Sequence, residues 1–287
     1  MNILVKGHSG CQIDVVSENN ILCIYKSSTD PQYLNRLALQ LEKQSKASAL
    51  VVPHIRVPKL YSLSSTSEAT VGIMEYVYSK NFIEFLEQAG FEQIDYFIEA
   101  MQQLIDYEVT HSTLEKITPS VFQDKFEEIF NKVEHNPLYK NDTEARELLN
   151  RCRELFNQLS DMILPIGMCH GDLTLSNILF NGNNYYLIDF LDSFIETPLQ
   201  DIVKLRQDTA YQWSQLMYTK NFDSIRLQII SKKIDDEIDS FFANKYEWYR
   251  DNYKTMQLMN ILRILPYAKE EKVIHHLKKI LTSLLHD

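Results

Sequence analysis

The 287-residue sequence lacks the features that mark several large classes of protein. No apolar stretch approaches the roughly 18–20 residues of a membrane-spanning helix. The first residues show no charged region followed by an apolar core, so they do not predict a secretory signal. The four cysteines form neither a CxxC pair nor a zinc-like spacing with histidine, which favours free thiols in a reducing compartment. Together these absences predict a cytoplasmic protein.

Positive charge is also scarce, because 29 Lys and Arg residues stand against 39 Asp and Glu residues. The formal net charge of −10 argues against nucleic acid or an anionic membrane surface as the main partner, since both are negatively charged. The excess mildly favours a neutral or cationic ligand, and it is equally compatible with surface carboxylates that serve only solubility. Nothing in the pattern specifies an oligomeric state.

The first 77 residues have the apolar pattern of β-strands with one inserted helix. The strand-like runs cover residues 2–6, 11–17 and 21–26, with two more near 57–63 and 69–77. Asp30 and Pro31 predict the start of the helix, because Asp can cap a helix and Pro suits its first position. Apolar residues then recur at positions 34, 37, 38 and 41, with the spacing of one helical face.

From Asn81 onward the apolar period changes to that of α-helices. Helical patterns cover residues 91–105, 119–134, 142–160, 199–219, 223–243 and 273–284. Residues 166–190 are the exception, because short apolar pieces there surround the turn sequence NGNN. The sequence therefore predicts an α+β fold, with a small β-rich lobe over residues 1–77 and a large, mainly helical lobe over residues 78–287.

One polar loop interrupts the apolar pattern in the sequence MCHGDLTLSNILF, residues 168–180. It supplies the carboxylate of Asp172 and, five residues later, the carboxamide of Asn177. Asp189 follows after a hairpin-like segment. Carboxylate and amide oxygens suit a hard cation such as Mg²⁺, and a carboxylate beside them can accept a hydroxyl proton. These are the groups that phosphoryl transfer to an alcohol requires.

The pattern H-G-D, then Asn177, then I-D-F resembles the catalytic segments of the protein-kinase-like superfamily. Glycine at position 171, where protein kinases carry arginine, resembles the small-molecule branch, which includes aminoglycoside phosphotransferases and choline and ethanolamine kinases. The resemblance implies a bilobal protein-kinase-like fold with ATP and Mg²⁺ between the lobes. It also implies that Asp172 is the catalytic base, that Asn177 and Asp189 are the Mg²⁺ ligands, and that His170 braces the loop.

The same resemblance implies a lysine on the third strand that pairs with the phosphates, and a glutamate on the next helix that holds this lysine. Lys26 and Glu42 occupy these places. Glu42 continues the helical row of Ala38, so we expect it to face inward while Arg36 and Lys43 face solvent.

Two further segments resemble nucleotide-binding parts of the family. The loop at residues 7–10 would cover the phosphates with backbone N–H groups, although it does not match the protein-kinase G-x-G-x-x-G pattern. The segment GIMEYVYS resembles the hinge that bonds adenine through its backbone. The residues assigned to the nucleotide on this basis are Ser9 and Gly10 in the loop, Glu75 and Val77 in the hinge, and Met74 behind the base.

Downstream, Asp201 matches the family aspartate that opens the next helix, where a carboxylate favours the helix end and can brace the catalytic loop. Two positions depart from the pattern. Leu191 replaces the glycine of protein kinases, and residues 196–198 read Glu-Thr-Pro instead of Gly-Asp-Pro. The second departure predicts a differently shaped turn.

The acceptor side carries weaker signals. Asp192 and Asp208 could belong to an anionic substrate rim, or they could be solvated surface charges. A set of aromatic residues could line a pocket for a cationic substrate, although packing in a core is the more common role of such residues. They are Trp213, Tyr211, Tyr218, Trp248, Tyr249 and Tyr253.

The acceptor itself stays open among an aminoglycoside, an amino alcohol, a sugar and a nucleoside-like metabolite. Residues 170–198 also resemble phosphotransferases of surface-polysaccharide assembly. Two alternatives to a small-molecule kinase are a protein Ser/Thr kinase and a non-catalytic nucleotide-binding module. Only eleven residues separate Asp189 from Asp201, which is short for an activation segment that docks a polypeptide.

Overall fold

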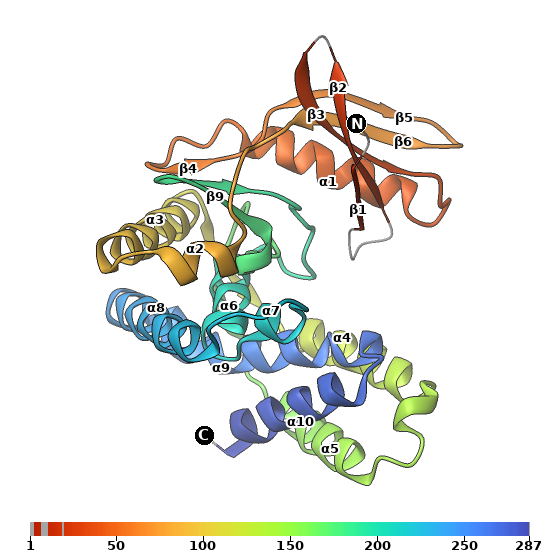
Figure 1. Ribbon diagram of the computed structural model, residues 1–287. Helices are drawn as coiled ribbons and strands as arrows, with labels where there is room; N and C mark the ends of the chain where they lie inside the picture. The colour runs from red at the N-terminus through yellow and green to blue at the C-terminus, as the bar shows by residue number, and fades with distance from the viewer. Residues whose placement is uncertain (1–2, 7–10, 19, 287) are drawn as a thin grey trace. The chain divides into compact units, whose positions relative to one another are not determined.

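The computed structural model describes residues 3–6, 11–18 and 20–286. The chain forms two compact units, each built from three segments (Figure 1). The first unit contains Met1–Tyr107, His170–Ser193 and Phe222–Ile230, and the second contains Glu108–Cys169, Phe194–Asn221 and Ser231–Asp287. The sequence predicts lobes that are continuous in the chain, at residues 1–77 and 78–287, whereas these units are defined by contacts in space and each combines separated segments. The lobe boundaries therefore stay a prediction.

The first unit contains a five-stranded antiparallel sheet, as the sequence predicts. Its strands, in spatial order, are β1 (Ile3–Lys6), β2 (Gln12–Glu18), β3 (Ile21–Ser28), β6 (Thr70–Glu75) and β5 (Leu60–Ser65). Within the sheet, Lys26 of β3 lies opposite Ile13 of β2 and Gly72 of β6. The neighbouring strands β2 and β6 thereby fix the backbone of Lys26 from both sides.

Helix α1 (Leu34–Ala47) packs against this sheet (Figure 1). Leu37 and Leu41 are buried with Met74. A Cβ atom on Gly72 would lie 2.6 Å from Leu41 Cδ1, so glycine at this position permits the close approach of the helix. The apolar face that the sequence predicts for this helix is therefore confirmed.

The helix begins one turn later than Asp30 and Pro31 predict. The Asp30 carboxylate accepts a hydrogen bond from the Gln32 N–H (3.0 Å), and the Asp30 carbonyl accepts bonds from Tyr33 and Leu34. The aspartate therefore closes a turn before the helix instead of capping the helix itself.

A hairpin and two helices complete the core of the first unit. The hairpin strands are β9 (Ile178–Asn181) and β10 (Asn184–Leu187), and the short β4 (Ile55–Arg56) pairs in parallel with β10. The helices are α2 (Phe82–Gln88), which starts with a capping box, and α3 (Phe91–Thr110), which continues into the second unit. Phe85, Phe97, Phe180 and Tyr185 form an aromatic cluster among these elements.

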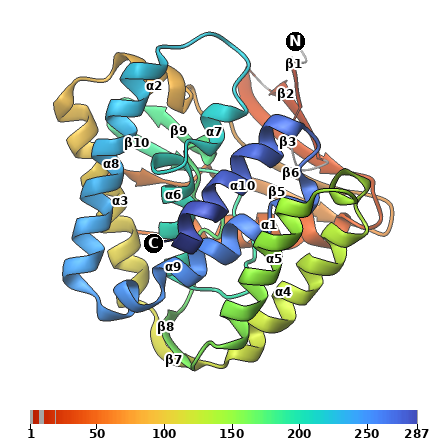
Figure 2. The same ribbon diagram turned by 90° about the horizontal axis from the view of Figure 1, so that it is seen from below.

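The second unit is mainly helical, as the sequence predicts for this part of the chain (Figure 2). Its elements are the antiparallel pair β7 (Thr113–Ile117) and β8 (Met162–Ile166), and helices α4 (Pro119–Glu134), α5 (Thr143–Asn157), α6 (Pro198–Thr209), α7 (Trp213–Leu216), α8 (Ser224–Lys245, starting in the first unit), α9 (Glu247–Leu262) and α10 (Glu271–His286). Helix α6 packs on α9, and α10 packs on both α5 and α9. The α+β fold class is therefore confirmed.

The helix expected over residues 199–219 is interrupted. Helix α6 ends at Thr209, and Gln212 then adopts the left-handed region with φ +57°.

Among the described residues, no helix is both long enough and apolar enough to cross a membrane.

Candidate functional site

The loop that follows β8 holds Asp172 and Asn177 against each other. A short 3₁₀ turn, Leu175–Asn177, brings the asparagine back toward the aspartate. Asn177 Nδ2 donates to Asp172 Oδ2 (2.9 Å) and to the Asp172 carbonyl (2.8 Å). Because the amide nitrogen is used in this way, the carboxamide oxygen of Asn177 is the atom available to a cation.

His170 ties this loop to the end of strand β10. The side chain is fully buried; Nε2 donates to the Ile188 carbonyl (2.8 Å), and Nδ1 accepts from the Asp172 N–H (3.2 Å). One neutral tautomer satisfies both bonds. Burial lowers the pKa of His170 to about 4, even though the charge of Asp172 opposes the shift. The ring is therefore neutral at pH 7 and bonded on both sides, as expected of a brace.

Gly171 occupies a position that only glycine fits. Its φ is +86°, and a Cβ atom would lie 2.0 Å from the Leu191 carbonyl oxygen. The Leu191 N–H in turn donates to the His170 carbonyl (2.9 Å). Residues 170–172 and 188–193 therefore form two closely stacked backbone segments, and an arginine at position 171 would separate them.

Asp189 comes directly after this hairpin and contacts the strand-borne lysine. Its φ is +62°, a left-handed conformation that Asp tolerates better than most residues. Asp189 Oδ1 lies 2.6 Å from Lys26 Nζ, and Lys26 is only 4% exposed. Burial alone would lower the pKa of Lys26, but the charge and hydrogen bond of Asp189 outweigh this effect and raise it. The lysine is therefore held as a cation.

The expected ion pair between Lys26 and Glu42 is wrong. Glu42 is exposed, whereas its neighbour Lys43, which was expected to face solvent, is buried. A four-residue step on an α-helix advances about 400°, so each such step turns a further 40° away from the starting row. Ala38 is already at the flank of the buried face, and Glu42 therefore turns toward solvent.

Lys43 is a functional candidate that the sequence analysis missed, because it was expected to face solvent. Lys43 lies three residues after Gln40 and four before Ala47, both of which are buried, so it sits at the edge of the buried face and not within the apolar row of Leu34, Leu37 and Leu41. The apolar period of the sequence therefore gave no signal for it. Its Nζ atom donates to the Leu191 carbonyl (2.6 Å).

The hinge residues also lie in the first unit. Met74 is buried between the sheet and α1, and Glu75 ends β6. The Glu75 N–H donates to the Lys59 carbonyl (2.9 Å), and its carboxylate accepts from the Lys59 N–H (3.1 Å). Val77 follows, half-buried. Their contacts with adenine stay predictions, and Ser9 and Gly10 lie outside the described residues.

On the acceptor side, Asp208 is not part of an exposed rim. It is buried, and its two carboxylate oxygens accept bonds from the Ser214 N–H (2.8 Å) and the Ser214 hydroxyl (2.9 Å). Because residue 212 breaks the helix, Asp208 is needed to satisfy the start of α7. The side chain of Asp192, in contrast, is 60% exposed.

The remaining predicted residues lie in the second unit. Asp201 is fully buried in the first turn of α6, where the sequence places a helix start. Trp213 is half-buried at the start of α7, and its contact with a substrate stays a prediction. Trp248 and Tyr249 are buried, so these two aromatic residues serve the core.

The donor set fits Mg²⁺. The described residues contain no group of three or more His, Cys, Asp or Glu side chains that could hold a metal ion by themselves. Asn177 and Asp189 offer an amide oxygen and a carboxylate, and the Ile188 N–H donates to the Asn177 carbonyl (3.0 Å), which joins their two segments. Mg²⁺ commonly takes only one or two protein oxygens when phosphates and water supply the rest of its ligands.

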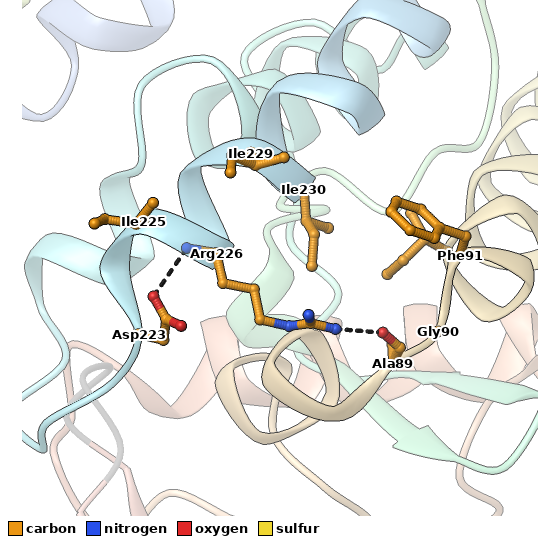
Figure 3. A pocket seen from close by; sticks show the side chains of 9 residues that line it. Ala89, Gly90, Phe91, Asp223, Ile225, Arg226, Ile229 and Ile230 are labelled. Atoms are coloured by element: carbon orange, nitrogen blue, oxygen red, sulfur yellow. Dashed lines mark hydrogen bonds between the residues drawn. The ribbon is translucent and has the colours of Figure 1, made fainter.

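A separate hollow of about 610 Å³ lies between the α2–α3 junction and the first turns of α8 (Figure 3). Its lining is largely apolar and includes none of the site residues predicted from the sequence. The guanidinium of Arg226 donates to the carbonyls of Ala89 (2.6 Å) and Leu86 (3.2 Å), so its charge serves the end of α2. The hollow is therefore distinct from the lysine–aspartate site.

A buried strand lysine bonded to an aspartate, next to an Asp–Asn loop, is the arrangement of a kinase-like phosphotransferase. The model of the phosphotransferase enzyme family matches residues 24–224, and the chain belongs to this family. No curated protein matches the sequence.

Solved structures share the fold across the whole chain. One is a thermostable mutant of aminoglycoside phosphotransferase APH(4)-Ia in a ternary complex with AMP-PNP and hygromycin B, at 9% identity and a TM-score of 0.61, covering 100% of this chain and 93% of that one. Another is amicoumacin kinase hAmiN in complex with AMP-PNP, Ca²⁺ and Ami, at 9% identity and a TM-score of 0.61, with coverages of 99% and 88%. A third is a putative fructosamine-3-kinase from Haemophilus somnus 129PT, at 12% identity and a TM-score of 0.57, with coverages of 100% and 91%. The chain therefore has the kinase-like fold.

Proposed function

We propose that this protein is an ATP-dependent phosphotransferase that moves the γ-phosphoryl group to a hydroxyl of a small molecule. The observation that carries the proposal is the bonded set in the first unit, in which Lys26 contacts Asp189 and Asn177 contacts Asp172. Membership of the phosphotransferase family supports the same conclusion. An ATP-dependent reaction also agrees with the cytoplasmic location expected from the sequence.

Each residue of the set has a distinct task in this proposal. Lys26 pairs with the nucleotide phosphates, and Asn177 and Asp189 hold Mg²⁺, which neutralises phosphate charge when bound. Asp172 orients the acceptor hydroxyl and accepts its proton. Because the transition state of phosphoryl transfer is loose, the protein contributes mainly positioning and charge stabilisation.

His170 and Asp201 support the site without touching the reacting atoms. The neutral ring of His170 joins the Asp172 loop to the segment that carries Asp189. Asp201 is buried in the first turn of α6 in the second unit, and we assign it a structural role at the start of that helix.

The acceptor is a sugar, an aminoglycoside or an amino alcohol. Structures with the same fold are described with hygromycin B and with amicoumacin, which supports a small hydroxyl-bearing acceptor. The net charge of −10 favours a cationic one. A role in surface-polysaccharide metabolism is the narrowest form of this proposal, and only the resemblance of residues 170–198 supports it.

The test is a screen of ADP release with ATP and Mg²⁺ against a panel of hydroxyl-bearing metabolites, aminoglycosides and peptides. Acceptor-dependent ADP release with a small molecule supports the proposal. Release only with peptides favours a protein kinase, and nucleotide binding without turnover favours a binding module; either result contradicts the proposal.

The role of Asp172 has its own test. The Asp172→Ala variant is expected to lose turnover by at least about 100-fold, because general-base catalysis contributes on the order of 10²–10⁴-fold. Its nucleotide affinity should stay close to that of the wild type. Activity that survives in this variant would show that the base is a different residue.

A further inference from the structure

Helix α1 carries a buried lysine that contacts the Asp189 segment. The side chain of Lys43 is 9% exposed, and its Nζ atom lies 2.6 Å from the Leu191 carbonyl oxygen and 3.9 Å from Asp192 Oδ1. Lysine side chains are seldom buried this deeply unless they are paired. A hydrogen bond from a charged donor is stronger than a neutral one, so this contact is a substantial anchor.

The Leu191 carbonyl is also a point of close approach between the two catalytic segments. Gly171 packs against this oxygen so tightly that a Cβ atom would lie 2.0 Å away. The peptide unit is held from the other side by the bond between the Leu191 N–H and the His170 carbonyl. Lys43 therefore bonds a carbonyl that lies directly where residues 170–172 and 188–193 pack against each other.

Asp189 depends on this packing, because it lies two residues before Leu191 in a left-handed conformation with φ +62°. A non-glycine residue in this region is retained only when its surroundings fix it. Lys26 fixes the side chain of Asp189, and Lys43 fixes the backbone that follows it.

We propose that Lys43 is a positioning residue that holds the 189–193 segment from helix α1, so that Asp189 is oriented for Mg²⁺. This inference rests on the proposed function, since it takes Asp189 as a metal ligand. In this chain, helix α1 does not hold Lys26 through a carboxylate. It holds the metal-ligand segment directly, through a cation bonded to a main-chain carbonyl.

The consequence for Mg²⁺ follows from the general behaviour of residues that orient a metal ligand. Loss of such a partner typically weakens metal affinity or activity by about 10–100-fold. We therefore expect Lys43→Met, which keeps the apolar stem and removes the charged donor, to raise the Mg²⁺ concentration needed for nucleotide binding about tenfold. Binding in EDTA should change less than about twofold, because Lys26 is untouched.

The matched control is Lys46→Met, which removes a lysine from the exposed side of the same helix. Two measurements are made on both variants and on the wild type. The first is a Mg²⁺ titration of the binding of N-methylanthraniloyl-ATP, followed by its fluorescence. The second is hydrogen–deuterium exchange of peptides that cover residues 188–194, without nucleotide.

The expected result is a higher Mg²⁺ requirement and at least about tenfold faster exchange at residues 188–194 in Lys43→Met alone. Lys43→Arg retains a charged donor and should recover at least half of the Mg²⁺ response. The proposal is overturned if Lys43→Met matches the control, if exchange accelerates equally throughout the chain, or if Lys43→Arg folds but behaves like Lys43→Met. Lys43→Gln replaces the Met variant if that variant does not fold.

The two proposals fail in different ways. A wild-type protein that binds no nucleotide would contradict the proposed function, while exchange at residues 188–194 would still test the positioning by Lys43. Unchanged exchange in Lys43→Met would overturn the positioning even if ATP is bound and turned over.

Discussion

At the scale of single residues, His170 makes the folded protein sensitive to acid. Burial lowers its pKa to about 4, from an ordinary value of about 6.5. The unfolded chain therefore binds a proton at a pH where the folded chain does not. The stabilising contribution is fully present above about pH 6.5 and is lost as the pH falls toward 4.

The predicted size of this effect is about 2 kcal/mol between pH 7 and pH 5, from the two pKa values. Urea unfolding at the two pH values measures it. In His170→Gln the side chain no longer titrates, so this component of the pH dependence should disappear, although the variant is less stable at pH 7. An unchanged difference between the two pH values would show that other groups cause the acid sensitivity.

Gly171 allows a sharper comparison, because Gly182 has a similar backbone in open surroundings. Both have positive φ, but a Cβ atom on Gly182 meets no atom within 4 Å. Gly182→Ala should cost only the left-handed conformation, about 1–2 kcal/mol. Gly171→Ala must also displace the Leu191 carbonyl, so we expect a loss of at least about 3 kcal/mol or failure to fold.

The measurement is the free energy of urea unfolding of the two variants, with activity as a second readout. Equal losses would mean that the backbone at Leu191 moves freely and that the stacking of the two segments is unimportant. A Gly171→Ala protein that is stable but inactive would instead place the effect on the orientation of Asp189.

Single residues also show how far sequence reasoning reaches. Lys26 and Asp189 are 163 positions apart in the chain and form a hydrogen bond. The family resemblance assigned both residues to one nucleotide–Mg²⁺ site, although it did not predict this direct bond. The predictions for Glu42 and Asp208 were wrong for local reasons. For Glu42 the reason is the rotational phase of helix α1, and for Asp208 it is the break of the expected helix at Gln212. Such details depend on packing that no motif encodes.

At the scale of elements, Arg226 connects the start of α8 to the end of α2 (Figure 3). The last carbonyls of a helix have no partner within the helix, and the guanidinium satisfies two of the carbonyls in this region. We expect Arg226→Met to lower the free energy of unfolding by about 1.5–3 kcal/mol, the range for hydrogen bonds to a charged group. Arg226→Lys should lose less, because one donor can still reach a carbonyl.

Urea unfolding of Arg226→Met and Arg226→Lys provides the comparison. A loss shared equally by the two variants would mean that the planar, two-pronged geometry is essential. No loss in either would mean that water satisfies the end of α2 equally well.

The elements missed from the sequence have a common physical cause. Helix α9 is buried on all sides at Met256 to Leu262, so its apolar residues do not alternate with a polar face. Strand β7 was missed for the opposite reason: four of its five residues are exposed, so it has no buried face for an apolar pattern to mark. Amphipathic helices such as α4, α5 and α10 show a clear period and were predicted within a few residues.

At the scale of the whole molecule, the two units divide the chain differently from its sequence order. The residues proposed for the nucleotide, Lys26 on β3 and Asn177 and Asp189 around the hairpin, all belong to the first unit. A ligand that binds only the folded state raises the free energy of unfolding by about 2.7 kcal/mol at 100 times its Kd. Bound nucleotide should therefore protect one unit built from three separated segments.

We predict that AMP-PNP with Mg²⁺ slows hydrogen–deuterium exchange most strongly at residues 20–30, 70–80 and 170–193, which lie in this unit. Residues 119–157, which form α4 and α5 of the second unit, should change little. Lys26→Ala should remove the protection, because the phosphates lose the lysine ammonium group that pairs with them. Asp172→Ala should retain the protection. Protection concentrated in α4 and α5 would place the nucleotide away from Lys26 and contradict the site, while loss of protection in Asp172→Ala would make Asp172 a binding residue as well as a base.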